Sequence, residues 1–309
     1  MKIRIRPLGS YINFSILPAL ILVLVMLGVS MFFRSDEIIL PELSALSVGC
    51  FVYKIPHWTS KPLALFYIPS GTAVIGFVIN MFTLPIYIKL ILVLVAMIAF
   101  LQIIRNNLAP ALATGLLPVI TDCRSFYFIG SILVFTFLLF LIVKFFYQNG
   151  EKEFEEKKGK NTLILPYVIL LIVWIVICKI INIPAMFAIP PVIVVGFEYV
   201  QNPSYNISMS IRHIIALAIA AFIGTWGIFY LHDFILVGIV DFIVVTLTLK
   251  FLNTKLPPAY AMAILPMVIG EHLNWLFPIY VLVMSIVHFA VVIFIKKKQL
   301  NKQLIKTKA

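Results

Sequence analysis

The chain carries little charge for its length. Only 12% of its 309 residues are Asp, Glu, Lys or Arg, whereas a soluble domain usually carries about 25% charged residues. Apolar residues make up 62% of the chain. A soluble core of this size has no room for so many apolar side chains, so the scarcity of charge excludes an ordinary soluble globular domain.

Cysteine is also rare, and the common catalytic signatures are missing. The three cysteines, Cys50, Cys123 and Cys178, lie far apart in the sequence, which excludes a disulfide framework and a paired-cysteine metal site. His, Cys, Asp and Glu form no group with metal-ligand spacing. The sequence has no P-loop, no Gly-x-Ser-x-Gly and no His-Glu-x-x-His. We therefore expect no metal and no cofactor, and we do not expect an enzyme.

Long apolar runs fill most of the chain. Ten of them have roughly 18–22 residues, the length needed to cross a hydrocarbon core about 30 Å thick, and two shorter ones contain prolines. Each crossing should be helical, because backbone polar groups in lipid need partners within their own segment. We expect an all-α polytopic membrane protein of about twelve segments: 12–33, 38–55, 63–83, 86–104, 108–121, 126–146, 163–182, 184–201, 211–231, 234–252, 256–270 and 274–295.

The two halves of the chain match at a near-constant offset. Gly76 and Gly224 are 148 positions apart. The same offset relates five residues of one short segment to five of the other: Pro110, Ala111, Ala113, Leu117 and Pro118 match Pro258, Ala259, Ala261, Leu265 and Pro266. A constant offset indicates an internal repeat. We therefore divide the chain into a first six-segment repeat (1–147), a charged linker (148–162) and a second six-segment repeat with a basic C-terminal tail (163–309).

The net charge of +12 raises the question of a nucleic-acid partner. Lys and Arg in membrane proteins mark cytoplasmic loops instead. If all twelve segments cross, nearly all of these residues fall on the side of the N-terminus, and most of that bias disappears if 108–121 and 256–270 only re-enter. We expect a multi-pass protein of the cell membrane, with both termini cytoplasmic, lipid contacts and no nucleic-acid partner. Whether the two short segments cross or re-enter stays open, as does the oligomeric state.

The two short segments are the leading candidates for a binding site. Proline suits a helix start, so we expect Pro110 and Pro258 to begin short helices and Pro118 and Pro266 to end them. Irregular backbone at membrane depth is tolerated only inside protein or along a water-filled cavity. Free N–H groups at such helix starts favour an anion, which makes Pro110, Ala111, Pro258, Ala259 and Tyr260 candidate substrate-binding residues. The alternative is a pair of kinked structural helices.

These segments resemble the signature of the HPP family of integral membrane proteins, where His-Pro-Pro-Ala-Gly-Ala precedes Leu-Pro. The match here is Leu256-Pro257-Pro258-Ala259-Tyr260-Ala261 followed by Leu265-Pro266, and the weaker copy is Leu108-Ala109-Pro110-Ala111-Leu112-Ala113 followed by Leu117-Pro118. The stretch from Gly196 to Pro203, and His213 after it, are similar to the family as well. The signature histidine is leucine in both copies. The resemblance implies a transporter of a small, nitrite-like anion.

Ionisable residues inside apolar runs are functional candidates by default. Asp241 lies eight residues into its run, near mid-membrane, where a carboxyl suits proton coupling, or where it could be hydrogen-bonded for packing. Glu198 lies near the cytoplasmic end of its segment, and we expect it to pair with Arg212 or His213 in a structural or gating role. Glu42 is expected near the outer face, in contact with solvent.

We therefore expect a secondary transporter of a small anionic solute, working by alternating access between the two repeats, with the two short segments meeting near the axis. Two other classes stay open. One is a membrane-embedded enzyme acting on lipid or isoprenoid substrates, which would need clustered polar residues at one interface. The other is a non-transporting sensor or assembly protein. A passive channel, insensitive to a proton gradient, is a variant of the first reading.

Overall fold

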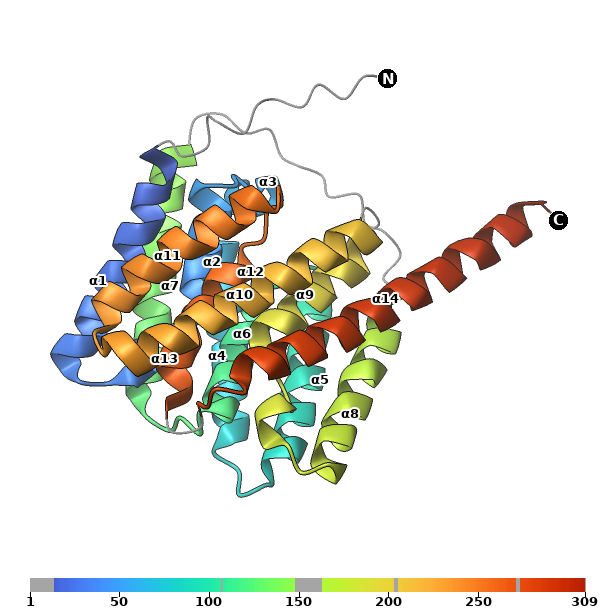
Figure 1. Ribbon diagram of the computed structural model, residues 1–309, viewed down its shortest axis with the longest axis horizontal. Helices are drawn as coiled ribbons and strands as arrows, with labels where there is room; N and C mark the ends of the chain where they lie inside the picture. The colour runs from blue at the N-terminus through green and yellow to red at the C-terminus, as the bar shows by residue number, and fades with distance from the viewer. Residues whose placement is uncertain (1–13, 107, 148–162, 203–204, 271–272, 309) are drawn as a thin grey trace.

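The computed structural model describes residues 14–106, 108–147, 163–202, 205–270 and 273–308. Every regular element in these ranges is a helix (Figure 1), which confirms the expected all-α class. The first half contains η2 (Phe14–Ile16), α1 (Leu17–Phe33), η3 (Asp36–Ile38), α2 (Pro41–Phe51), α3 (Pro56–Thr59), α4 (Ala64–Asn80), α5 (Ile86–Ile104), α6 (Ala111–Ile120) and α7 (Phe126–Tyr147). The second contains α8 (Ile164–Ile180), η4 (Pro184–Met186), α9 (Pro190–Gln201), α10 (Ile207–Leu231), α11 (Phe234–Phe251), α12 (Pro258–Ile264), α13 (Pro266–Ile269) and α14 (Phe277–Lys308).

Six helical segments of the described chain are long and apolar enough to cross a membrane: Ile86–Ile104, Phe126–Tyr147, Pro184–Gln201, Ile207–Leu231, Phe234–Phe251 and Phe277–Lys298. Five shorter apolar segments accompany them: Leu17–Phe33, Ala64–Asn80, Ala111–Ile120, Ile164–Ile180 and Pro258–Ile269. Many large apolar side chains face outward, among them Ile103, Phe145 and Phe251, each at least 80% exposed. Only lipid accommodates such a surface, and the architecture is that of a membrane-embedded protein.

The predicted segment 38–55 is not one continuous helix. After η3 the backbone is extended at Ile39 and Leu40, and α2 then begins at Pro41. Every residue of α2 is buried. The second half has a similar plan, in which η4 and an extended Ile189 precede α9. Proline at the first helical position explains both starts, because it needs no hydrogen bond there.

The two proline-flanked segments form short helices, as expected, but their ends differ from the prediction. Pro258 begins α12, and Pro110 is the residue just before α6. Pro266 does separate α12 from α13. Pro118, expected as a stop, lies inside α6, which continues to Ile120. A proline near a helix end loses only one backbone bond, so the last turn of α6 continues past it.

Helix ends in the two halves are built alike at matching positions. Residues with positive φ recur at the offset of 148, in the pairs Arg34 and Asn182, Arg105 and Asn253, and Asp122 and Gly270. The chain reversals after α1 and α8 share a backbone bond as well: Ser35 N donates to Ser30 O at 3.1 Å, and Ile183 N donates to Cys178 O at 3.0 Å. Left-handed residues of this kind terminate helices.

The two halves interlock. In the first half, α1 packs against α2. Across the two halves, α1 packs against α11 and α2 packs against α12, and α11 and α12 contact each other. We call these four helices the first ring. In the same way α8 packs against α9, α8 packs against α5, α9 packs against α6, and α5 and α6 contact each other. We call these four helices the second ring. Figure 1 shows the first ring at the left and the second at the right, with α1 and α8 at opposite edges and running in the same direction.

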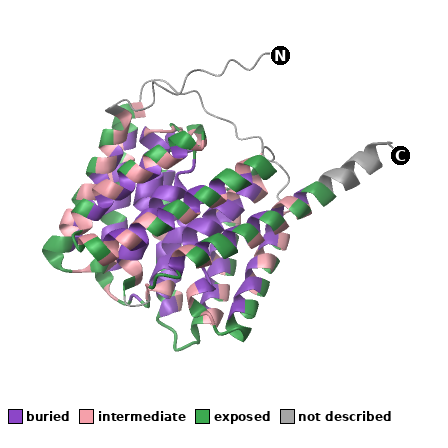
Figure 2. Ribbon diagram, viewed as in Figure 1, coloured by how far each residue is buried: buried purple, intermediate pink, exposed green. Residues whose placement is uncertain are grey.

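The core lies where the two rings meet. The residues of α2 and α12 are all buried, and α6 is buried from Ala111 to Val119. Figure 2 shows the buried positions concentrated in the centre and the exposed positions on the outward faces of the surrounding helices. The short helices are thus enclosed by protein, as the irregular backbone around them requires.

Candidate functional site

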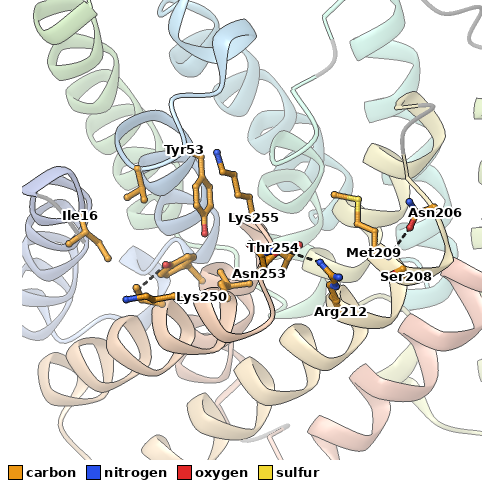
Figure 3. Close-up of a pocket in the computed structure, with 14 residues that line it drawn as sticks. Ile16, Tyr53, Asn206, Ser208, Met209, Arg212, Lys250, Asn253, Thr254 and Lys255 are labelled. Carbon is orange, nitrogen blue, oxygen red and sulfur yellow. Dashed lines mark hydrogen bonds between the residues drawn. The ribbon is translucent and has the colours of Figure 1, made fainter. Parts of the chain in front are cut away.

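A cavity of about 520 Å³ lies at the end of the first ring where α2 and α11 finish and α12 begins (Figure 3). The N-terminal end of α10 completes its wall. Its lining comes from both halves of the chain: Ile16, Val52, Tyr53, Asn206, Ser208, Met209, Arg212, Thr246, Leu249, Lys250, Asn253, Thr254, Lys255 and Tyr260. A pocket of this size, lined by apolar side chains and a few converging polar groups, is the usual form of a small-molecule site.

The charged side chains that line this cavity are all basic: Arg212, Lys250 and Lys255. Arg212 Nη1 donates to the carbonyl oxygen of Asn253 at 3.3 Å, which joins the start of α10 to the end of α11. Lys255 Nζ lies 5.8 Å from the centre of the Tyr53 ring. The cavity therefore favours an anion, since three cations and no carboxylate line it among the residues that the structure describes.

Tyrosine and threonine hydroxyl groups supply neutral polar groups in the cavity. The hydroxyl groups of Tyr260 and Thr246 are hydrogen-bonded at 2.9 Å, and the hydroxyl of Tyr53 interacts with that of Tyr260. Tyr53 follows the end of α2, so these hydroxyl groups connect the end of α2 to α11 and α12.

His213 connects the cavity to a buried aromatic cluster behind it. Its ring is fully buried, and its Nε2 and Nδ1 lie 3.0 Å from the hydroxyl oxygens of Thr254 and Tyr199. The expected pairing of Glu198 with Arg212 or His213 is wrong. Glu198 Oε2 accepts a hydrogen bond from the Tyr205 hydroxyl at 3.3 Å, because Tyr205 stacks on Tyr199 and brings its hydroxyl there.

The predicted substrate-binding residues take different places. Tyr260 lines the cavity, whereas Pro258 and Ala259 are buried just before it in the first turn of α12. Pro110 and Ala111 are buried at the start of α6 and do not line this cavity. The helices α6 and α12 were expected to meet near the axis; the structure shows that both contact α2 and α9. Sequence patterns gave no sign of this, because α2 and α9 read as ordinary apolar runs.

Two carboxyl groups buried in the first ring have oxygens without a hydrogen-bond partner. Asp241 of α11 is 1% exposed, and neither of its carboxyl oxygens has a hydrogen-bond partner among the described residues. Glu42 of α2 is 2% exposed, and its Oε1 likewise has none. The expectation that Glu42 contacts solvent is wrong, because α2 begins inside the protein and not at its surface. A carboxyl without a partner in such a place is costly and is a functional candidate.

Several lining residues escaped the sequence analysis. Tyr53, Thr246 and Lys250 were not singled out, although Thr246 lies five positions after Asp241 in the same apolar run. The closeness of this hydroxyl residue to Asp241 in the sequence could have marked Thr246 as a candidate site residue. Nothing in the pattern pointed to Tyr53, which reaches the cavity because the chain turns sharply after α2.

A second polar group lies at the opposite end of the helices. Lys89 is 6% exposed, and its Nζ donates to the backbone oxygen of Asn80 at 2.8 Å and to its Oδ1 at 3.0 Å, with Asp122 Oδ1 at 3.9 Å. Asn80 Nδ2 donates to Cys123 O at 2.9 Å. The group ties the end of α4 to the start of α5 and to the turn after α6.

Across the part of the chain that the structure covers, no group of three or more His, Cys, Asp or Glu could hold a metal ion. Comparison with known proteins adds no assignment, since no family model, no curated protein and no solved structure matches the chain. The resemblance to the HPP family stays a prediction, and the function rests on the geometry of the site.

Proposed function

We propose that this protein is a secondary transporter of a small anion and not an enzyme. The observation that supports this most is the cavity at the end of the first ring, where Arg212, Lys250 and Lys255 are the charged lining residues and Tyr260 lies inside. Tyr260 belongs to the segment that resembles the HPP signature, which implies the same class of solute. Membrane lipid is the surrounding partner.

We propose further that the chain consists of two six-segment repeats, 1–147 and 163–309, joined by the linker 148–162, with about twelve membrane segments. Three pairs of positive-φ residues at one offset support this, as do two close approaches at the same offset. Gly76 lies against Gly115 O, and Gly224 lies against Ala263 O. Because α1 and α8 run in the same direction (Figure 1), the repeats would be parallel and related by an axis along the membrane normal.

The proposed location is the cell membrane, with the cavity on the cytoplasmic side. Basic residues gather at the cavity end of the helices: Lys54, Lys61, Arg105, Arg212, Lys250 and Lys255. Fewer lie at the opposite ends: Arg34, Lys89, Arg124 and Lys179. The positive-inside rule assigns the richer side to the cytoplasm. Both termini would then be cytoplasmic, and 108–121 and 256–270 would count as crossings.

Alternating access needs two bodies that move relative to each other. The two repeats are poor candidates for rigid bodies, because α1 and α2 pack against α11 and α12 of the other repeat. We propose that the two rings move instead. Their contacts with each other include those between α2 and α6 and between α9 and α12. Asp241, inside the first ring, would accept the coupling proton.

Uptake by proteoliposomes tests the transport proposal. We would measure uptake of nitrite, nitrate, formate and acetate against protein-free vesicles. We expect Arg212→Gln and Lys250→Gln each to lower nitrite uptake at low concentration by about ten- to hundredfold, since a hydrogen bond to a charged group contributes about 1.5–3 kcal/mol. Lys61→Gln is the matched control, because Lys61 is exposed at the same end and does not line the cavity. Absence of flux for every anion would refute the transporter.

A further inference from the structure

The two rings have the same arrangement of helices but different chemistry. The first ring holds Asp241 and Glu42. At the offset of 148, Asp241 corresponds to Val93 in the second ring, and at the offset of 147 that relates Gly49 to Gly196, Glu42 corresponds to Ile189. Val93 and Ile189 are also buried. One ring therefore carries two buried acids where the other carries two apolar side chains.

The two acids lie at similar depth behind the cavity. Glu42 is nine residues before Phe51, the end of α2, and Asp241 is ten residues before Phe251, the end of α11. At about 1.5 Å per residue these separations are about 14 Å and about 15 Å along the helices. If Phe51 and Phe251 mark the cytoplasmic edge of a hydrocarbon core about 30 Å thick, both carboxyl groups lie about half-way across it.

The two acids lie on different helices of the first ring, α2 and α11. Both α2 and α11 contact α1 on one side and α12 on the other. Gly238 lies beside Leu27 of α1, and Phe242 lies beside Tyr260 of α12, at 5.0 Å between ring centres. Asp241 directly precedes Phe242 in α11 and is itself buried. The cavity lies at the end of this same ring, where Tyr53 after α2 and Thr246 on α11 line it.

No cation among the described residues neutralises either carboxyl. The titratable groups on the elements that pack against α2 and α11 are Tyr260 of α12, His57 of α3, Tyr127, Lys144 and Tyr147 of α7, and Arg212, His213 and Tyr230 of α10. None of the hydrogen bonds or ion pairs of the described chain joins one of them to Glu42 or Asp241. An ionised carboxylate in this apolar setting would cost far more than a protonated one.

We propose that Glu42 and Asp241 are two proton-binding groups inside the first ring, behind the basic cavity, and that the second ring has no counterpart to them. The role of these protons in driving solute rests on the proposed transport function, whereas the protonation itself does not. A proton suits the site better than a metal cation, which would need about six oxygen ligands.

Infrared spectroscopy of the full-length protein in lipid tests the proton site without transport. Each protonated buried carboxyl gives a carboxylic-acid C=O band. We expect two such bands at neutral pH, one lost in Glu42→Gln and the other in Asp241→Asn. Glu42→Asp keeps a carboxyl group, so it should shift the band of Glu42 without abolishing it. This variant serves as the test if Glu42→Gln does not fold. Asp36→Asn is the matched control, because Asp36 is an exposed acid outside the ring.

Two results would overturn the proposal. Bands that survive in both amide variants would assign the protons elsewhere. Bands that disappear when potassium is replaced by sodium would show that the acids hold a metal cation. Nitrite accumulation driven by a proton gradient separates this proposal from the transport function: we expect Glu42→Gln and Asp241→Asn to reduce it to the level of protein-free vesicles. If the wild-type protein moves no anion, the transport proposal fails, and the infrared bands still decide the proton site.

Discussion

Gly224 of α10 lies against the carbonyl oxygen of Ala263 in α12, so that a methyl group added to Gly224 would overlap that oxygen. The first half contains the same arrangement, in which Gly76 of α4 lies against the carbonyl oxygen of Gly115 in α6. Helices in membranes approach this closely only where small residues allow it. The contact fixes α12, and with it Tyr260, at the cavity.

We expect Gly224→Ala to destabilise the protein by about 1–3 kcal/mol, because the obstructing atom belongs to the backbone and can move only with the whole helix. The thermal midpoint of the purified protein in detergent would measure this. Gly28→Ala on α1 is the control, since an added Cβ there meets nothing within 4 Å. The control should be unchanged or slightly more stable, because alanine favours helix. An equal loss in the two variants would contradict the close approach.

Lys89 is expected to be a structural residue and not a transport residue. Lys89→Met would leave the backbone oxygen and the Oδ1 of Asn80 without their buried donor. Losing the partner of a buried acceptor costs about 1–3 kcal/mol, so the thermal midpoint should fall clearly. Lys61→Met, at an exposed lysine, should leave it nearly unchanged. If Lys89→Met kept its stability but lost anion uptake, the lysine would have to belong to the solute path.

The fold class and most helix positions could be predicted from the apolar runs, because a lipid environment requires long helices. The run 86–104 matches α5 at both ends. The prediction of one continuous helix over 38–55 was wrong, since hydropathy cannot distinguish a buried extended segment such as Ile39 and Leu40 from a helix. The predicted exposure of Glu42 was wrong for the same reason, because α2 begins inside the protein and Glu42 is buried there.

The site was predicted only in part. Tyr260 and Arg212 were named from the sequence and line the cavity. Tyr53 and Lys250 come from other segments, and only the packing of α2 and α11 around α12 brings them together. The pairing of helices between the two halves has no signature in hydropathy, since every lipid-facing and core-facing run is equally apolar. The contacts that α6 and α12 share with α2 and α9 could not be predicted for that reason.

Tyr260→Phe tests the hydroxyl groups in the cavity. The substitution removes the hydrogen bond to Thr246 and the interaction with Tyr53 while it keeps the ring. A neutral hydrogen bond contributes about 0.5–1.5 kcal/mol, so we expect the KM for nitrite uptake to rise about two- to tenfold. The maximal rate should change little. Tyr67→Phe, on an exposed face of α4, should alter neither value. An unchanged KM in Tyr260→Phe would place the solute elsewhere.

Cysteine labelling tests the parallel arrangement of the repeats. Lys61 precedes α4 and Ser208 opens α10, at matching positions of the two halves, and Arg124 lies in the turn between α6 and α7. We expect Lys61→Cys and Ser208→Cys to react with a membrane-impermeant maleimide from the cytoplasmic side, and Arg124→Cys from the opposite side. Labelling of Lys61→Cys and Ser208→Cys from opposite sides would mean inverted repeats.

The native cysteines should not interfere with this experiment. Cys50, Cys123 and Cys178 are free and at most 3% exposed. Burial raises the pKa of the Cys123 thiol to about 12, so at neutral pH almost none of it is the thiolate that reacts with maleimide. We therefore expect labelling of the wild-type protein to stay at background at neutral pH. Labelling should increase only in strongly alkaline solution, where Cys123 begins to ionise. Rapid labelling of the unmodified chain at neutral pH would mean that the turn after α6 opens to solvent, and the accessibility of Arg124→Cys would then have to be measured with Cys123 replaced by serine.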